Sequence, residues 1–436
     1  MYDTNLLEDQ PIAWRPTPDV IERAQLTKFM KQVGITTWDE LYEFSIRDVE
    51  NFTEEVLKFL DIKFDPPYEK LLDISDGVEL PNWLSRSADT PVRMSVASTR
   101  TSAQDSQSSS SDASLAGGTG DADKSVRAPS AGLNITTMCL DRWQTDEMKD
   151  QPALIWEDEI GAKWHWSYEE LLEQVENCAS GLRYNGIKKG DAVAIHLPMT
   201  EDIATVLLAI CRVGAIAVPV FSGYGVEAIT SRMNAVNAKA LFTFTRIWRR
   251  GKLFDGFKIA TEAVTRCPSV TKVIVRDTIG NGPEFPDERF EDWHDFLSFD
   301  YDVKGSAGWH EMHYPEPTSA EDPLIILYTS GTTGKPKGIA HTHASFPIKA
   351  AQDMAFGTDV GRGTRISWYT DIGWMMGPWL IYGALINGAT ICIYDGAPDY
   401  PTPDRMWEFC AKHKVEVLGI SPTLIRSLAA SEESSA

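Results

Sequence analysis

From about residue 150 to the end of the chain, short apolar runs alternate with amphipathic stretches of helical spacing. The apolar runs predict buried strands, and the stretches between them predict helices. Strands are expected at 191–198, 215–221, 240–244, 271–275, 323–328, 365–370, 389–394 and 415–420. Helices are expected at 202–213, 226–236, 252–266, 377–387 and 403–413. This order favours a parallel α/β sheet with helices on both faces.

The first part of the chain has a helical pattern only. Apolar positions recur at helical spacing within residues 17–72. A helix start is predicted at Thr17, where a proline follows, and a stop at Gly34. A capping box of the form Thr-x-x-Glu opens the next helix at Thr37. We therefore expect a small helical cap at residues 1–94.

A segment rich in serine, aspartate and glycine separates this cap from the α/β region. Residues 95–131 contain almost nothing that could be buried, so they predict a disordered insert. The insert is either an inert linker or a phosphorylated regulatory segment. The remaining residues, 132–436, are expected to form one larger α/β domain.

The net charge limits the possible partners. The chain has 41 Lys and Arg against 63 Asp and Glu, a formal charge of −22. Such a field repels nucleic acid and anionic lipid, so neither is expected as a partner. The acidic surface suits adaptation to high salt, which screens self-repulsion, or an ordinary acidic enzyme. Measuring folding against KCl separates these two interpretations.

Cysteine usage and the apolar segments indicate a cytoplasmic protein. The six cysteines are scattered without a CxxC motif or a His/Cys cluster, so neither a zinc site nor a disulfide framework is expected. No basic segment followed by an apolar one opens the chain, and no signal peptide is expected. The longest apolar stretch, 203–221, carries Arg212 at its middle, which a bilayer would penalise. A buried helix leading into a strand is expected there, with no membrane partner.

A loop crowded with glycine, hydroxyl side chains and lysine follows the strand at 323–328. It is not a Walker A loop, because only two residues separate Gly331 from Gly334 and Pro336 stands where a Ser or Thr would be needed. Its backbone N–H groups, hydroxyls and cations suit a departing polyphosphate. The alternative is a flexible surface turn. The candidate phosphate-binding residues are Thr329, Ser330, Gly331, Thr332, Thr333, Gly334, Lys335 and Lys337.

This loop, YTSGTTGKPKG, resembles the phosphate loop of the AMP-forming acyl-CoA synthetases. Four other segments extend the resemblance, the last two of them to the acetyl-, propionyl- and acetoacetyl-CoA synthetase branch: 166–175, 207–225, 133–143 and 368–396. The likeness covers residues 1–430 apart from the insert. It implies the layered parallel-sheet N-terminal domain of the acyl-adenylate-forming fold, preceded by a small helical cap.

The resemblance also implies an acid–thiol ligase reaction in two steps. A short-chain carboxylate of the acetate or propionate type attacks the α-phosphate of ATP, and pyrophosphate leaves. The CoA thiol then displaces AMP. ATP, CoA and Mg²⁺ are therefore expected as substrates and cofactor, with no bound prosthetic group. Because the substrate supplies the nucleophile, no Ser-His-Asp set is needed, and no GxSxG motif occurs.

An acyl pocket follows from the same resemblance. Trp374, Met375 and Met376 would form its wall, or they would simply fill the core, as methionine and aromatic residues often do. The two methionines replace a smaller Val-Thr pair associated with strict acetate enzymes. The identity of the acid therefore stays open.

Basic residues and histidines complete the candidates. Arg246, Arg249 and Arg250 lie where the family contacts CoA and could bind its 3′-phosphate, or they could form a solvated basic turn. His341 and His343 follow the phosphate loop. They either help to line the site or stand at a helix start without a specific role.

Several family motifs would follow 421–426 and are not found in this sequence. They are the adenine-binding segment, a Thr-Glu motif whose Glu helps to bind magnesium, a ribose-binding Asp, and a C-terminal lid domain with the adenylation lysine. No catalytic residue is therefore assigned, and we expect this chain alone to be inactive. Three hypotheses stay open: a truncated or split N-terminal part completed by a second chain, an inactive nucleotide-binding or regulatory module, or a nonfunctional remnant with an exposed sheet edge.

Overall fold

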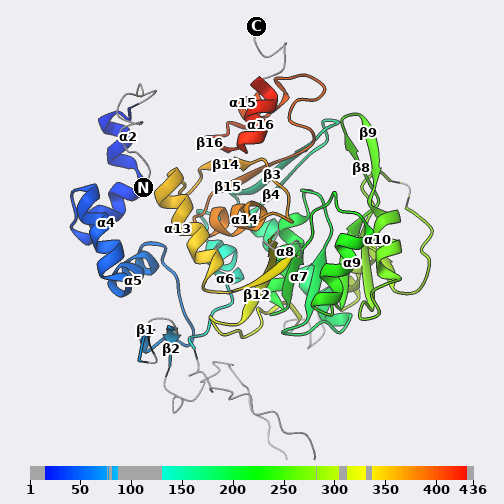
Figure 1. The fold of residues 1–436 in the computed structure, drawn as a ribbon, viewed down its shortest axis with the longest axis horizontal. Helices are drawn as coiled ribbons and strands as arrows, with labels where there is room; N and C mark the ends of the chain where they lie inside the picture. Colours follow the sequence, from blue (N-terminus) through cyan, green and yellow to red (C-terminus); the bar gives the residue numbers. More distant parts are fainter. Residues whose placement is uncertain are drawn as a thin grey trace, which may run out of the picture.

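The structure is a computed structural model that describes residues 15–75, 77, 81–86, 130–280, 282–303, 312–329 and 336–429. An N-terminal helical unit lies against a larger body in which helices flank two sheets (Figure 1). Most strands in both sheets run parallel, which confirms the predicted α/β class.

The larger sheet has seven strands in the order β11-β10-β7-β5-β6-β12-β13. All neighbours are parallel except β12 and β13, which form an antiparallel edge. The inner strands are apolar and buried on both faces, as parallel sheets require. The strands are β5 (Ala192–Ile195), β6 (Ile216–Pro219), β7 (Ala240–Phe244), β10 (Lys272–Arg276), β11 (Phe290–Asp292), β12 (Pro323–Thr329) and β13 (Lys337–Thr342).

The smaller sheet has five strands in the order β16-β14-β15-β3-β4. Its neighbours are parallel except β3 and β4 at one edge. The strands are β3 (Pro152–Asp158), β4 (Lys163–Ser167), β14 (Arg365–Trp368), β15 (Thr390–Asp395) and β16 (Val417–Gly419).

Helices cover the sheets, and one hydrophobic core spans both of them. Every residue of α8 is buried, and so is almost all of α14, because both helices are apolar on nearly every side, with Arg212 of α8 as an exception. The helices of the body are α6 (Thr136–Cys139), α7 (Tyr168–Tyr184), α8 (Ile203–Arg212), α9 (Val226–Ala235), α10 (Gly256–Val264), α11 (Trp293–Val303), α13 (Phe346–Thr358), α14 (Met376–Ile386), α15 (Arg405–His413) and α16 (Pro422–Ala429), with a 3₁₀ turn η1 (Asp141–Trp143).

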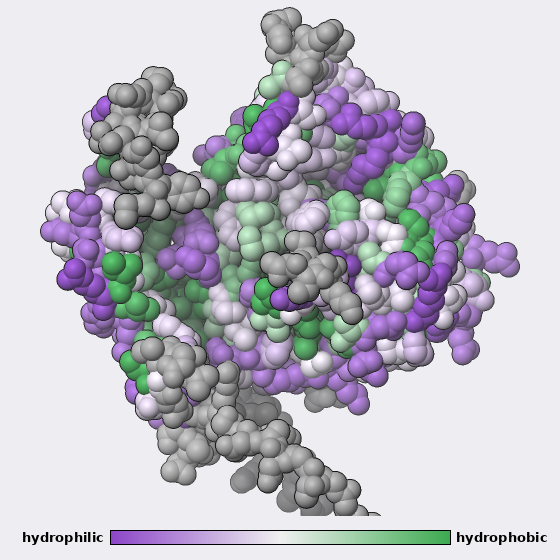
Figure 2. Space-filling view, in the orientation of Figure 1, coloured by the Kyte–Doolittle hydropathy of each residue, from purple (hydrophilic) through white to green (hydrophobic). Residues whose placement is uncertain are grey.

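The N-terminal unit contains α2 (Pro18–Arg23), α3 (Gln25–Val33), α4 (Trp38–Arg47) and α5 (Val49–Phe59), followed by the antiparallel pair β1 (Lys70–Asp73) and β2 (Asn82–Ser85). Gly34 ends α3 with a φ of 71°, and Thr37 forms the predicted capping box. The prediction of helix up to residue 72 is wrong at its end, because β1 pairs with β2. Phe29 packs on Phe356 of α13 with ring centroids 4.6 Å apart, which seats the unit on the body. Apolar residues gather at this junction, whereas hydrophilic residues cover much of the outer edge of the molecule in this view (Figure 2).

The predicted helix at 252–266 is also wrong at its start. Residues 246–255 form a hairpin of β8 (Arg246–Arg249) and β9 (Lys252–Asp255). Arg250 and Gly251 both have positive φ, 51° and 68°, which is the backbone of a tight two-residue hairpin turn. The helix α10 begins only at Gly256, where the Asp255 carboxylate accepts a hydrogen bond from the Lys258 amide at 2.9 Å.

The apolar stretch at 203–221 forms a buried helix, α8, that leads into β6, as predicted. Within the described residues, no helix is long and apolar enough to cross a membrane. Residues 95–129 of the predicted insert lie outside the described residues. Ser130 pairs with Ser85 of β2, and the buried Ala131 donates its amide to the Leu84 carbonyl at 2.8 Å.

Candidate active site

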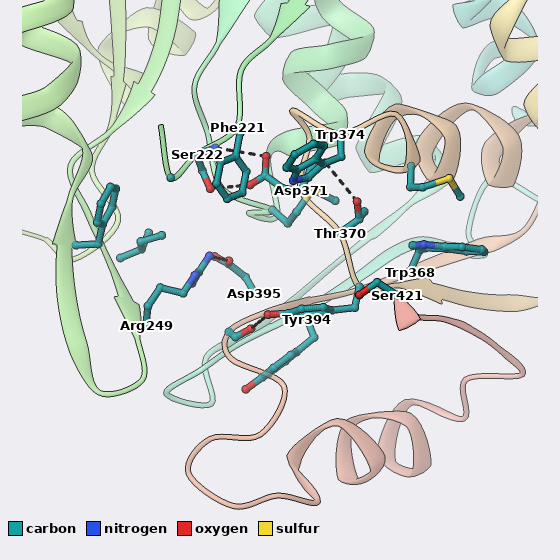
Figure 3. A pocket seen from close by; sticks show the side chains of 17 residues that line it. Phe221, Ser222, Arg249, Trp368, Thr370, Asp371, Trp374, Tyr394, Asp395 and Ser421 are labelled. Carbon is teal, nitrogen blue, oxygen red and sulfur yellow. Dashed lines mark hydrogen bonds and ion pairs between the residues drawn. The ribbon is translucent and has the colours of Figure 1, made fainter. Parts of the chain in front are cut away.

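The main cavity among the described residues, about 650 Å³, opens at the carboxyl ends of five parallel strands. Segments that end or follow β5, β6, β14, β15 and β16 line it, and the β8–β9 hairpin closes one side (Figure 3). Ligands of α/β proteins bind at such strand ends. Its lining residues are Met199, Phe221, Ser222, Gly223, Ile247, Arg249, Phe254, Trp368, Tyr369, Thr370, Asp371, Trp374, Met376, Tyr394, Asp395, Gly396 and Ser421.

Asp371 ties together two of the segments that line the main cavity. Its Oδ2 accepts a hydrogen bond from the Ser222 hydroxyl at 2.6 Å. Its Oδ1 accepts from the backbone amides of Ser222 at 3.3 Å and Gly373 at 2.8 Å. Burial raises the pKa of the Asp371 carboxyl to about 6 although these donors oppose the shift. The segment after β6 and the turn before α14 are thereby held at a fixed separation.

Replacing Asp371 with alanine is expected to destabilise the protein by about 1–3 kcal/mol, because the buried Ser222 amide and the half-buried Gly373 amide lose their acceptor. Asp371→Asn keeps a carbonyl acceptor and should lose less. The folded-state pKa of Asp371 is raised, so its carboxyl favours folding less as pH rises from about 4 to about 6. Urea unfolding across this range should show a smaller slope in Asp371→Asn than in the unchanged protein, while Asp202, whose pKa burial also raises to about 6, keeps its contribution in both. An equal slope in both would contradict the assignment.

The predicted acyl-pocket residues do not all reach the main cavity. Trp374 and Met376 line it, and the Trp374 ring lies 5.6 Å from the Phe221 ring between centroids. Met375 is 57% exposed and is not among the lining residues. Phe221 was not predicted, and its ring lies beside Trp374 in the cavity (Figure 3), which Met376 also lines.

The three predicted arginines have different surroundings. Arg249 lines the main cavity and donates to the Asp395 carboxylate (Figure 3). Arg250 donates to Asp399 at 2.9 Å, whereas Arg246 lines a second, smaller cavity instead. Burial raises the pKa of the Asp395 carboxyl even though the Arg249 guanidinium opposes that shift. Two of the three arginines are thus held by carboxylates.

The turn of the β8–β9 hairpin is fixed by one further carboxylate. Glu159 accepts hydrogen bonds from the backbone amides of Arg250 at 3.0 Å and Gly251 at 2.8 Å. It also accepts from the Ala397 amide at 2.9 Å. Because Glu159 is 7% exposed, these bonds are shielded from water. They hold the hairpin, and with it Arg249, against the end of the smaller sheet.

The predicted phosphate loop connects β12 to β13. Thr329 ends β12 and pairs with Lys337 at the start of β13, whereas Ser330–Lys335 lie outside the described residues. Ile325 of β12 pairs in parallel with Ala217 of β6. Continued along both chains, this register brings the end of β12 to the level of Phe221, which lines the main cavity.

Neither predicted histidine lines the main cavity or starts a helix. His341 lies on β13 and packs against Phe346 with ring centroids 5.1 Å apart. His343 is fully buried, and its Nδ1 accepts a hydrogen bond from the Ile135 amide at 3.2 Å. Burial lowers the pKa of His343 to about 4, so its imidazole is neutral at neutral pH. Helix α13 begins later, at Phe346.

Comparison with known proteins identifies the family. The model of the family described as AMP-binding enzyme matches residues 141–436. The chain belongs to the AMP-binding enzyme family. An acetyl-coenzyme A synthetase from Nostoc linckia is 39% identical over 299 residues, which are 68% of this chain and 86% of that protein. The sequence therefore groups with the acyl-CoA synthetases of this family, as its motifs predicted.

Other relatives are much longer than this chain. An acetyl-coenzyme A synthetase from Coprinopsis cinerea is 38% identical over 302 residues, which cover 69% of this chain and 44% of that protein. One from Alkalilimnicola ehrlichii is 32% identical over 421 residues, 95% of this chain and 55% of that protein. The chain thus spans about half the length of these relatives.

A solved structure shares the fold. The acetoacetyl-CoA synthetase from Streptomyces lividans superposes with a TM-score of 0.76 and 24% sequence identity. The match covers 95% of this chain and 56% of that chain. The predicted acyl-adenylate-forming architecture is therefore confirmed at the level of fold.

Proposed function

We propose that this chain contributes the acid- and nucleotide-binding part of an AMP-forming acyl-CoA synthetase for a short-chain carboxylic acid. The main cavity carries the proposal. It combines an apolar wall of Trp374 and Met376 with the cation of Arg249, next to the end of β12. An apolar wall suits a short acyl chain, and a guanidinium suits phosphate oxygens.

In the first step of the proposed reaction, a carboxylate oxygen of the acid bonds to the α-phosphorus of ATP as the bond to pyrophosphate breaks. Residues 329–337 would hold the β- and γ-phosphates, where backbone N–H groups and two lysines stabilise the charge on the leaving group. In the second step the sulfur of CoA bonds to the acyl carbon, AMP leaves, and the thiol loses its proton. Met376 would limit the acid, at about 1–3 kcal/mol of discrimination per methylene.

Magnesium accompanies ATP in reactions of this kind. Across the described residues, no group of three or more His, Cys, Asp or Glu side chains could hold a metal ion. For CoA, the proposal keeps Arg246, Arg249 and Arg250, of which Arg249 and Arg250 would exchange Asp395 and Asp399 for phosphate oxygens.

The phosphate-loop assignment is tested by ATP binding. Replacing Lys335 and Lys337 together with alanine is expected to weaken ATP binding by about tenfold or more, because two charge-assisted contacts to the phosphates are lost. Lys349→Ala is the matched control, since Lys349 is an exposed lysine of α13 paired with Asp353. Isothermal titration of all three proteins with ATP measures the effect. Equal affinities would refute the assignment.

Turnover is tested separately by carboxylate-dependent exchange between ATP and pyrophosphate, using acetate, propionate and butyrate. We expect ATP binding without exchange from these 436 residues, because the motifs that the family uses for adenine, magnesium and the lid are not among them. Robust exchange would refute the expected inactivity and would leave the cavity assignment intact. A chain that binds no ATP would overturn the proposed function itself.

A further inference from the structure

His196 is a buried histidine to which the proposed reaction gives no role. It directly follows β5 and is 0% exposed. It does not line the main cavity, so it acts on a ligand there only through other residues. One ring nitrogen lies 3.1 Å from the Thr243 hydroxyl of β7, and the other lies 3.1 Å from the Ser222 carbonyl oxygen. The side chain therefore joins β7 to the segment after β6, which does line the main cavity.

The partners of His196 fix the form of its imidazole ring. A carbonyl oxygen only accepts, so Nε2 carries a proton and donates to Ser222. Burial lowers the pKa of His196 to about 4, although the bond to Ser222 opposes that shift, so the ring is neutral at pH 7. In a neutral ring the other nitrogen, Nδ1, accepts, and here it accepts from the Thr243 hydroxyl. The two contacts thus select the Nε2–H tautomer.

Ser222 is held from both sheets. Its hydroxyl and its backbone amide donate to Asp371, which lies after β14 of the smaller sheet (Figure 3). Its carbonyl accepts from His196, which lies after β5 of the larger sheet. Ser222 is 7% exposed, so water competes little for these bonds. The three polar groups of Ser222 are therefore all fixed by partners.

The anchoring of Ser222 decides where the neighbouring Phe221 ring lies in the main cavity. That ring is 5.6 Å from the Trp374 ring between centroids (Figure 3). The backbone of Phe221 also touches the turn before α14, because a Cβ at Gly373 would stand only 2.1 Å from the Phe221 nitrogen. With no side chain between the two backbones to absorb a displacement, a movement of Ser222 changes the separation of the Phe221 and Trp374 rings.

We propose that His196 is a positioning residue that sets the width of the acid-binding part of the main cavity. Its bond to the Ser222 carbonyl holds Phe221 against Trp374, and this pair of rings limits the length of the acyl chain that binds. The inference rests on the proposed function, which places the acid in this cavity. It adds a residue that contacts no substrate and still determines which acids are accepted.

The test measures the affinities of the full chain for propionate and hexanoate, by saturation-transfer NMR titration at pH 7 and constant ionic strength. His196→Leu removes the bond to Ser222. The ratio of the two affinities should then shift towards hexanoate by about tenfold, because each further methylene that a yielding wall admits changes affinity by at least that order. His196→Gln keeps an N–H donor and should restore most of the ratio. Thr243→Val removes only the donor to Nδ1 and should shift the ratio in the same direction by less.

His343→Leu is the matched control. His343 is also fully buried, and burial likewise lowers its pKa to about 4, but its Nδ1 accepts from the Ile135 amide, and neither residue lines the main cavity. This variant should lower the unfolding temperature and leave the ratio of affinities unchanged. Thermal unfolding establishes that each variant is folded. If His196→Leu is not, Thr243→Val decides.

NMR of the full chain, labelled in its histidine ring nitrogens, tests the geometry without any acid. The ring signals that disappear in His196→Gln should be those of a neutral Nε2–H tautomer at pH 7, and an Nδ1–H tautomer or a charged ring would overturn the proposal. A ratio of affinities that stays unchanged in the folded His196 and Thr243 variants, or that shifts equally in His343→Leu, would overturn it too. If neither acid binds the unchanged protein saturably, the proposed function fails together with this inference, whereas saturable binding with an unchanged ratio refutes the inference alone.

Discussion

Replacing Arg212 with methionine is expected to lower the free energy of unfolding by about 3 kcal/mol, the lower end of the cost of breaking a buried ion pair, because Asp141 and Glu176 remain partly exposed. Arg212 is 2% exposed and lies at the end of the apolar helix α8. Its guanidinium donates to both carboxylate oxygens of Asp141, at 2.9 and 3.0 Å, and to Glu176 at 2.9 Å. The variant leaves these carboxylates without their cation.

The environment of Glu176 explains why the loss is large. Burial raises the pKa of Glu176 even with Arg212 in contact, so the charged carboxylate already destabilises the folded state. Without the Arg212 guanidinium this destabilisation increases. Arg212 also donates from Nε to the His313 carbonyl at 2.8 Å, and this acceptor loses its donor as well.

Equilibrium urea unfolding at pH 7 measures the effect, and Arg47→Met is the matched control. Arg47 pairs with Glu43 on α4, but the two side chains are 78% and 47% exposed. A surface pair of this kind contributes about 0.3–0.5 kcal/mol. The variant Arg212→Met with Asp141→Asn and Glu176→Gln should recover part of the loss, since no unpaired charge remains. Similar losses in Arg212→Met and Arg47→Met would show that the buried cluster contributes nothing specific.

Some strands and helices of the body could be predicted because each carries its signal locally, whereas β3, β4, α7 and α13 lie outside the predicted ranges. The strand expected at 389–394 is β15, in which every residue is buried on both faces. The helix expected at 202–213 is α8 within one residue at each end. Parallel strands and buried helices need continuous apolar runs, and these runs are visible without knowledge of the partner strand.

The β8–β9 hairpin could not be predicted in this way. Its turn depends on Glu159, whose carboxylate holds the Arg250 and Gly251 amides from 91 and 92 residues away in the sequence. From the local sequence alone, residues 252–255 were predicted to be the first turn of the helix that in fact begins at Gly256. A tight turn with a basic residue at positive φ becomes favourable only once the smaller sheet supplies that carboxylate.

The candidate site was predictable only in part, for the same reason. Trp374 and Met376 were found from their motif, but the residues that hold the cavity were missed. Asp371 accepts a hydrogen bond from Ser222, 149 residues away in the sequence, and Asp395 accepts one from Arg249, 146 residues away. A polar residue directly after a buried strand was the available signal in both cases, because such positions face the ligand edge of a parallel sheet.

Replacing Glu157 with glutamine should remove about 3 kcal/mol of stability at neutral pH, little of it at pH 2 and none below. Glu157 lies on β3 and is 1% exposed. It accepts hydrogen bonds at 2.7 Å from Arg405 and Lys412 and lies 2.7 Å from the His413 imidazole, all on helix α15. Burial alone would raise the pKa of Glu157, but bonds from Lys412, His413 and Arg405 outweigh it and lower the pKa to about 2.

The sign of the pH dependence follows from that shift. The folded-state pKa lies below the ordinary value of 4.5, so the stabilisation by Glu157 is complete above about 4.5 and is lost as pH falls towards 2. Urea unfolding of Glu157→Gln and of the unchanged protein should therefore converge over this acid range. Glu408→Gln, at an exposed position of the same helix, should cost less than about 0.5 kcal/mol at any pH. A constant difference between Glu157→Gln and the unchanged protein down to pH 2 would mean that packing, rather than the carboxylate charge, fastens α15 to the smaller sheet.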